Sequence, residues 1–148
     1  MNMFRYVRQV IQEYQTHDAQ EMLRELGVCV YSFPMHGLRG LYKCFEGHPT
    51  VFVDSQLQER QQQFVLAHEL AHFLLHKGEN RVFLDRCTYL KTDRFEREAD
   101  LFALCFMFPF PQEYIHNGVT ISDIAHTLGI SEGLAELYCQ EYKRLIGI

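Results

Sequence analysis

The segment from Phe64 to Leu75, FVLAHELAHFLL, constrains the fold of this chain more than any other stretch. It has no Gly or Pro and continues a polar stretch after Asp54, so it predicts one long helix with a capping box of Ser55 and Gln58 at its start. The residues of this segment are apolar on nearly every face of the helix, which indicates that the second half of the helix is buried. Two His and one Glu therefore lie where polar side chains require partners.

His68, Glu69 and His72 form an HExxH motif, whose spacing is suited to a metal ion. Residues four apart lie about 40° apart around a helix and one turn along it, so both imidazoles can converge on one cation. Glu69 lies about 100° round from His68, beside the ion, where it can take a proton from water. Zinc is the expected ion, because hydrolytic zinc sites usually consist of imidazole ligands, one carboxylate and an open position for water. The alternative is a pair of core histidines, but this composition yields only about 0.04 such motifs by chance.

A catalytic zinc site requires a third protein ligand. His76 is one turn beyond His72, but it lies about 12 Å along the axis from His68, too far to share an ion. We interpret His76 as a helix C-terminal residue that interacts with free carbonyls.

A second buried helix, predicted from Asp93 to Phe108 and ended by prolines, offers carboxylates for this role. Glu96 and Asp100 are four residues apart, so one can bind the ion while the other accepts the ring N–H of a ligating histidine. The residues alone leave the choice open, because Asp93 and Glu96 also fit a helix cap, with Glu98 or Asp100 as the ligand.

The rest of the chain predicts a single α+β domain over residues 1–148. Three β-rich runs with short connections, at 28–33, 39–45 and 50–54, predict an antiparallel meander, and the third is a candidate edge strand for holding a peptide. Helices are expected near 4–15 and between Asp18 and Gly27. A C-terminal helical pair, at about 120–145, has Thr120 and Ser131 as its N-caps.

Composition excludes several classes of protein. The formal charge of −5 and the pI of about 5.9 argue against a nucleic-acid binder, which normally presents a basic face. The longest apolar run, 101–110, contains Pro109 and is too short to cross a membrane. Without a secretory signal at the start, the chain is expected in the cytoplasm, with its five cysteines reduced.

HELAHFLLH followed by EREADLFALCFMFP resembles the ImmA/IrrE family of small metallopeptidases over about residues 50–110. The family pattern E-x-x-A-(N/D)-x-F-A places its conserved acidic positions at Glu96 and Asp100, and the same spacing resembles the gluzincins. The resemblance implies that Glu96 is the third zinc ligand and that Asp100 orients a ligating histidine. It also implies a minimal zincin-like domain, with a short sheet packed on the HExxH helix and the second ligand-bearing helix.

The function implied by this resemblance is zinc-dependent cleavage of a regulatory protein, typically a helix-turn-helix repressor of a phage, mobile element or stress locus. Glu69 is then the general base, and later gives its proton to the departing amine. Tyr89, Tyr114 and His116 are the candidate side chains for stabilising the oxyanion.

Two alternatives do not involve proteolysis. The tail has the sequence pattern of a helix-turn-helix, so one alternative is a DNA-binding regulator with a structural metal. The N-terminal half of the expected recognition helix, which should contact bases, is however acidic, with Glu132 and Glu136. The other is a metal-binding module that docks onto a partner without cutting it, and a closed four-ligand site would favour that function.

Overall fold

The computed structural model describes residues 1–76 and 89–148, and of residues 89–93 only the backbone. Helices and strands follow one another as α1 (Met3–Tyr14), α2 (Ala19–Glu25), β1 (Cys29–Phe33), β2 (Gly40–Phe45), β3 (His48–Asp54), α3 (Glu59–Leu75), α5 (Tyr89–Met107), the 3₁₀ turn η1 (Pro111–Glu113), α6 (Ile121–Leu128) and α7 (Glu132–Ile146). The described part is therefore α+β, as predicted.

The sheet is mixed, and the prediction of an antiparallel meander is wrong. The strand order is β1-β3-β2, with β3 parallel to β1 and antiparallel to β2. The physical reason is burial: Val51 and Val53 of β3 are almost completely buried, so this most buried strand takes the centre, which a meander would give to β2. The run at 50–54 is consequently not an edge strand, and within the described residues the edges are β1 and β2.

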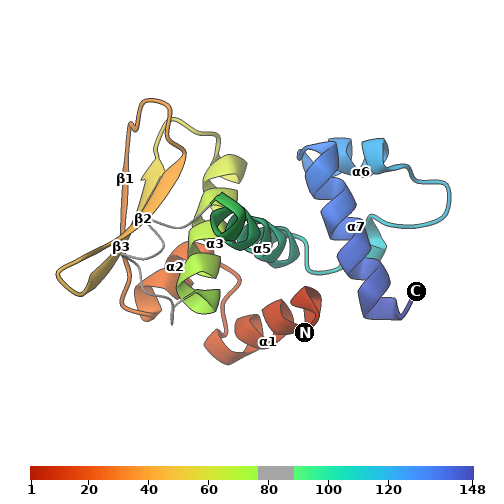
Figure 1. Cartoon of the computed structure of the whole chain (residues 1–148), viewed down its shortest axis with the longest axis horizontal. Helices are drawn as coiled ribbons and strands as arrows, with labels where there is room; N and C mark the ends of the chain where they lie inside the picture. Colours follow the sequence, from red (N-terminus) through yellow and green to blue (C-terminus); the bar gives the residue numbers. More distant parts are fainter. Residues whose placement is uncertain (77–88) are drawn as a thin grey trace.

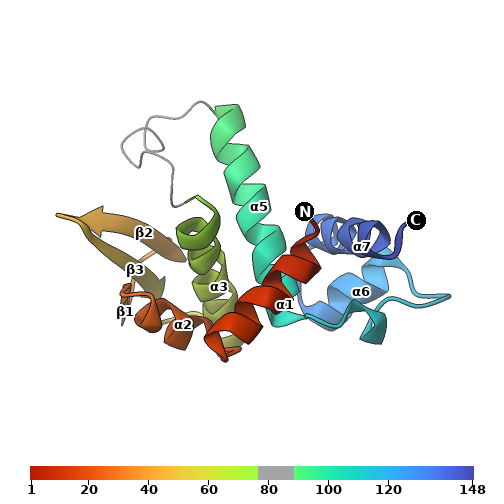
Figure 2. The same cartoon turned by 90° about the horizontal axis from the view of Figure 1, so that it is seen from below.

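Two long helices, α3 and α5, form the middle of the molecule (Figure 1). The sheet lies on one side of them and α6 with α7 on the other, while α1 runs along the face seen in Figure 2. Contacts join α3 to α5, α2, β2 and β3, and join α5 to α1 and α7. The two helices predicted to be buried are thus the central elements of the fold.

Local sequence sets most helix ends. Thr120 and Ser131 accept backbone N–H groups at 3.1 and 3.2 Å and begin α6 and α7, and Gly129 ends α6 with a positive φ of 71°. The predicted cap at Ser55 is wrong, because Asp54 accepts the backbone N–H of Gln56 and organises a turn there. The N-cap of helix α3 is instead Gln58, three residues later, and the helix begins at Glu59.

The chain ends are tied together through the core. Phe4 of α1 packs edge-to-face on Tyr138 of α7, and the backbone N–H of Met3 donates to the buried carboxylate of Glu141. These contacts place α7 against α1 and α5, and α6, the other helix of the C-terminal pair predicted at about 120–145, packs on α7. None of the described helices has the length and apolar character needed to cross a bilayer.

Candidate metal centre

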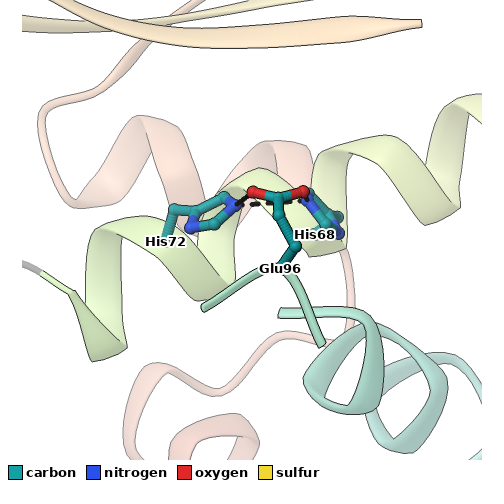
Figure 3. Close-up of side chains that lie close together, drawn as sticks. All are labelled: His68, His72 and Glu96. Carbon is teal, nitrogen blue, oxygen red and sulfur yellow. Dashed lines mark hydrogen bonds and ion pairs between the residues drawn. The ribbon is translucent and has the colours of Figure 1, made fainter. Parts of the chain in front are cut away.

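The two central helices bring three side chains to one point between them. His68 and His72 project from consecutive turns of α3, and Glu96 reaches them from α5 (Figure 3). The Nε2 atoms of the histidines lie 3.2 Å apart, and the Glu96 carboxylate oxygens lie 3.0 Å from His68 Nε2 and 2.7 Å from His72 Nε2. The i, i+4 spacing thus places both imidazoles on one face of the helix.

The donor atoms of these three residues fit a zinc ion. Zinc–ligand bonds near 2.0–2.1 Å and a tetrahedral angle require donor atoms roughly 3.3 Å apart. One nitrogen of each histidine and one oxygen of Glu96 all lie within 4.8 Å of one another, and the shortest separations are close to this value. The described residues therefore contribute three donors of the types that zinc takes in hydrolytic sites, where the fourth ligand is not a protein group.

Asp100 lies behind one of the histidines. Its Oδ1 atom accepts from His68 Nδ1 at 2.9 Å, which turns Nε2 of the same ring toward Glu96. Burial disfavours the charged imidazole, but the hydrogen bonds with Asp100 and Glu96 outweigh it and raise the pKa of His68 to about 10. The hydrogen bonds from His68 and His72 hold the pKa of Glu96 well below its usual range. The two carboxylates thus favour positive charge beside them.

Glu69 lies on α3 beside the two histidines, and only 7% of its surface is exposed. Burial raises the pKa of this carboxyl, and the nearby His72 and His68 oppose the shift. Strand β2 passes close to it: a Cβ atom on Gly40 would lie 3.7 Å from Glu69 Oε1 and 2.3 Å from Val65 Cγ1. A glycine within a strand often marks such a close approach, and sequence reasoning overlooked this signal.

His76 lies next to His72, a contact that sequence reasoning also missed. Its backbone N–H caps α3 by donating to the His72 carbonyl, in agreement with its expected C-terminal position. Its ring folds back, so that the Nδ1 atoms of His76 and His72 are 2.9 Å apart. Burial and the neighbouring His72 lower the pKa of His76 to about 4. Glu98, the alternative ligand, lies behind His76 at 3.8 Å from its Nε2.

The candidate oxyanion stabilisers are not brought to this point by the described contacts. Tyr89 begins α5, and its side chain lies outside the described residues. Tyr114 packs edge-to-face on Phe108, beyond the C-terminal end of α5, and His116 is exposed in the following loop. Glu96 is eleven residues before that helix end, or about 16 Å along the axis.

Two clefts lie near the centre, and one of them borders it. One of about 460 Å³ lies between α5 and α7 and is lined on one side by Glu96, Arg97 and Asp100 and on the other by Leu134 and Glu136, among others. The other, of about 490 Å³, also reaches Leu134 and runs past Phe64 and Arg60 of α3. The ring of Phe64 lies 6.4 Å from that of His68. The first cleft thus opens beside Glu96, and the second approaches the centre through Phe64.

Comparisons with known proteins agree with this geometry. The sequence profile of a peptidase family, described as the IrrE N-terminal-like domain, matches residues 23–138. The chain is 29% identical over 134 residues to an uncharacterised immunity region protein of Bacillus phage phi105, covering 88% of this chain and 85% of that protein. It is 28% identical over 97 residues to the metallopeptidase ImmA of Bacillus subtilis strain 168, covering 66% of this chain and 57% of ImmA.

Proposed function

This chain belongs to the ImmA/IrrE family of metallopeptidases, and from that premise we propose that it is a zinc-dependent endopeptidase that cleaves a regulatory protein. The convergence of His68, His72 and Glu96 within 4.8 Å is the observation that carries the proposal. In it, these three residues hold the ion, and Asp100 fixes the orientation of His68 through its hydrogen bond at 2.9 Å. A bound zinc ion supplies Lewis-acid chemistry, acidifying water and polarising the scissile carbonyl.

The protein's own contribution to proton transfer falls to Glu69. Its carboxylate accepts a proton from the attacking water and delivers it to the departing amine. Two features support this role: its position beside His68 and His72, and burial that moves its pKa upward from the usual carboxyl range. A general base with a raised pKa is better matched to giving the proton back near neutral pH.

The substrate chain is proposed to bind in an extended conformation beside β2. This strand has an edge that pairs with no other described strand, and Gly40 places its backbone close to Glu69. A peptide strand added there would form backbone hydrogen bonds, which do not depend on the side chains of the substrate. The two clefts, both lined in part by α7, would then receive flanking parts of the substrate and give the C-terminal helical pair a role in selection.

The proposed substrate is a helix-turn-helix repressor of a phage or mobile element, acted on in the cytoplasm. The name of the phi105 relative, an immunity region protein, supports a setting in which repression is controlled. The acidic formal charge of −5 and the exposed Glu132 and Glu136 at the start of α7 favour a protein partner over DNA.

Activity is tested with two substrates and one matched variant. Zinc-loaded protein and its Glu69→Gln variant are incubated with a proteome-derived peptide library and with helix-turn-helix repressors, including any that is encoded beside the chain's own gene. New termini are identified by mass spectrometry. We expect cleavage by the wild type only, with equal zinc content in both proteins by elemental analysis. Cleavage that persists in Glu69→Gln would contradict the assigned general base, and a zinc content of zero in the wild type would end the proposal.

A further inference from the structure

Each histidine of the centre has a partner on its second ring nitrogen, and only one of the two partners is a carboxylate. His68 Nδ1 is 2.9 Å from Asp100, whereas His72 Nδ1 is 2.9 Å from His76 Nδ1. In metal sites the second nitrogen of a ligating histidine almost always donates to an acceptor, which fixes the tautomer and the ring orientation. The proposed site therefore requires a hydrogen-bond acceptor at Nδ1 of His72, and the imidazole of His76 occupies that position.

The hydrogen bond between the two Nδ1 atoms has only one direction compatible with metal binding. His72 Nε2 faces Glu96 and must keep its lone pair for the ion, so the single proton of the neutral ring lies on Nδ1. His72 is then the donor and His76 Nδ1 the acceptor. His76 must carry its own proton on Nε2, and this atom lies 3.8 Å from Glu98 Oε1, close enough for electrostatic attraction to the carboxylate.

The surroundings hold the His76 ring in that orientation. The residue is only 4% exposed, and Phe95 of α5 lies against its ring with centroids 4.4 Å apart. Phe95 and Glu98 come from one turn of α5 and contact His76, while Glu96 and Asp100 of the same helix contact the two other histidines. Helix α5 thus contacts both rings at Nε2 through Glu96, whereas it supports Nδ1 of His68 directly through Asp100 and Nδ1 of His72 only through His76.

We propose that His76 is a positioning residue, which accepts the Nδ1–H of His72 and so fixes the tautomer and orientation in which His72 binds the metal. This inference rests on the proposed function, since it assumes that His72 is a ligand. His76 itself does not contact the ion, because its Nδ1 faces the back of the His72 ring.

Zinc affinity distinguishes this role from simple packing. The dissociation constant is measured by competition with a chromophoric chelator for the wild type, His76→Phe and His76→Asn. Loss of the acceptor in His76→Phe is expected to weaken zinc binding about 10- to 100-fold. Asn places an amide oxygen near the former Nδ1 position, so His76→Asn should recover most of the affinity. Phe73→Leu is the matched control, because it perturbs a buried apolar residue of the same helix turn and should leave zinc affinity unchanged.

The histidine tautomers of the zinc-loaded wild type, determined by NMR, give a second test that needs no variant. At 17.5 kDa the protein is small enough for long-range proton–nitrogen spectra of its histidine rings. We expect His72 protonated at Nδ1 and His76 protonated at Nε2. A His76 ring protonated at Nδ1, or an affinity in His76→Phe equal to that of the wild type, overturns the inference.

A His72→Ala variant separates this inference from the proposed function. If His72→Ala loses zinc while His76→Phe binds it as tightly as the wild type, only the positioning role fails. If His72→Ala binds zinc as tightly as the wild type, the ligand set is wrong, and the proposed function and the inference fall together.

Discussion

Replacing Gly40 by Ala is expected to destabilise the protein through a collision between β2 and α3. The added Cβ would lie 2.3 Å from Val65 Cγ1 and 3.1 Å from the backbone oxygen of Phe52. Carbon atoms in contact are normally about 3.5–4.0 Å apart, so either the strand or the helix must shift by more than about 1 Å. Val65 is 7% exposed and stiff at χ1 within a helix, which leaves it little freedom to rotate away.

The expected cost of Gly40→Ala is that of an overpacked core, about 1–3 kcal/mol in the free energy of unfolding. For a chain of this length, this cost lowers the melting temperature by about 3–10 °C. Urea denaturation of the metal-free protein, with an unchanged m-value, measures the change directly. Gly133→Ala serves as the control, because its Cβ would meet only Ser131 Oγ, at 3.9 Å, and alanine is favoured in a helix by about 0.5–1 kcal/mol.

A double-mutant cycle with Val65→Ala tests the cause. Each buried methyl removed costs about 0.5–1.5 kcal/mol, so Val65→Ala alone should cost about 1–3 kcal/mol. If the collision is the cause, adding Gly40→Ala to Val65→Ala should cost less than about 0.5 kcal/mol, giving a coupling within the range typical of residues in contact. Full additivity of the two substitutions, or a Gly40→Ala protein as stable as the wild type, would refute the reasoning.

Three further predictions concern metal removal and helix anchoring. Chelation of zinc should lower the melting temperature by about 5–10 °C relative to protein held at a free zinc concentration 100 times the dissociation constant. Calorimetry should find this difference in Glu69→Gln but not in His72→Ala, and a zinc-dependent shift in His72→Ala would contradict the ligand assignment. Glu141→Ala should cost about 1–3 kcal/mol in urea denaturation, because it leaves the buried Met3 N–H without its acceptor at 2.5 Å; an unchanged midpoint would show that this contact contributes nothing. Thr120→Ala should cost about 1 kcal/mol by loss of the α6 N-cap, and serine at this position should restore it.

Local patterns predicted the helices well, because the forces that start and stop a helix act over one or two turns. Thr120, Ser131 and Gly129 are confirmed as the boundaries of α6 and α7. The start of α3 was predicted wrongly at Ser55, where the side chain of Asp54 competes for the backbone N–H groups of the turn.

The arrangement of the sheet was not predictable from the spacing of its strands. Short connections favour a meander, yet β3 lies between β1 and β2. Burial decides the order: Val51 and Val53 face α3 and the core, and the central position pairs their strand on both sides. Residues that are far apart in the sequence supply this driving force, so no local pattern contains it.

The amino-acid sequence alone determined that His68 and His72 share a face of one helix and that an acidic pair recurs four residues apart on another, because helical periodicity depends only on the backbone. It left open which carboxylate meets the histidines. Packing of α3 against α5 decided this, turning Glu96 to both Nε2 atoms and Asp100 to the far side of His68. Packing also brought Phe95 and Glu98 against His76, whose ring backs His72. These contacts depend on the rotation and crossing of two helices, which the whole core sets and no single segment encodes.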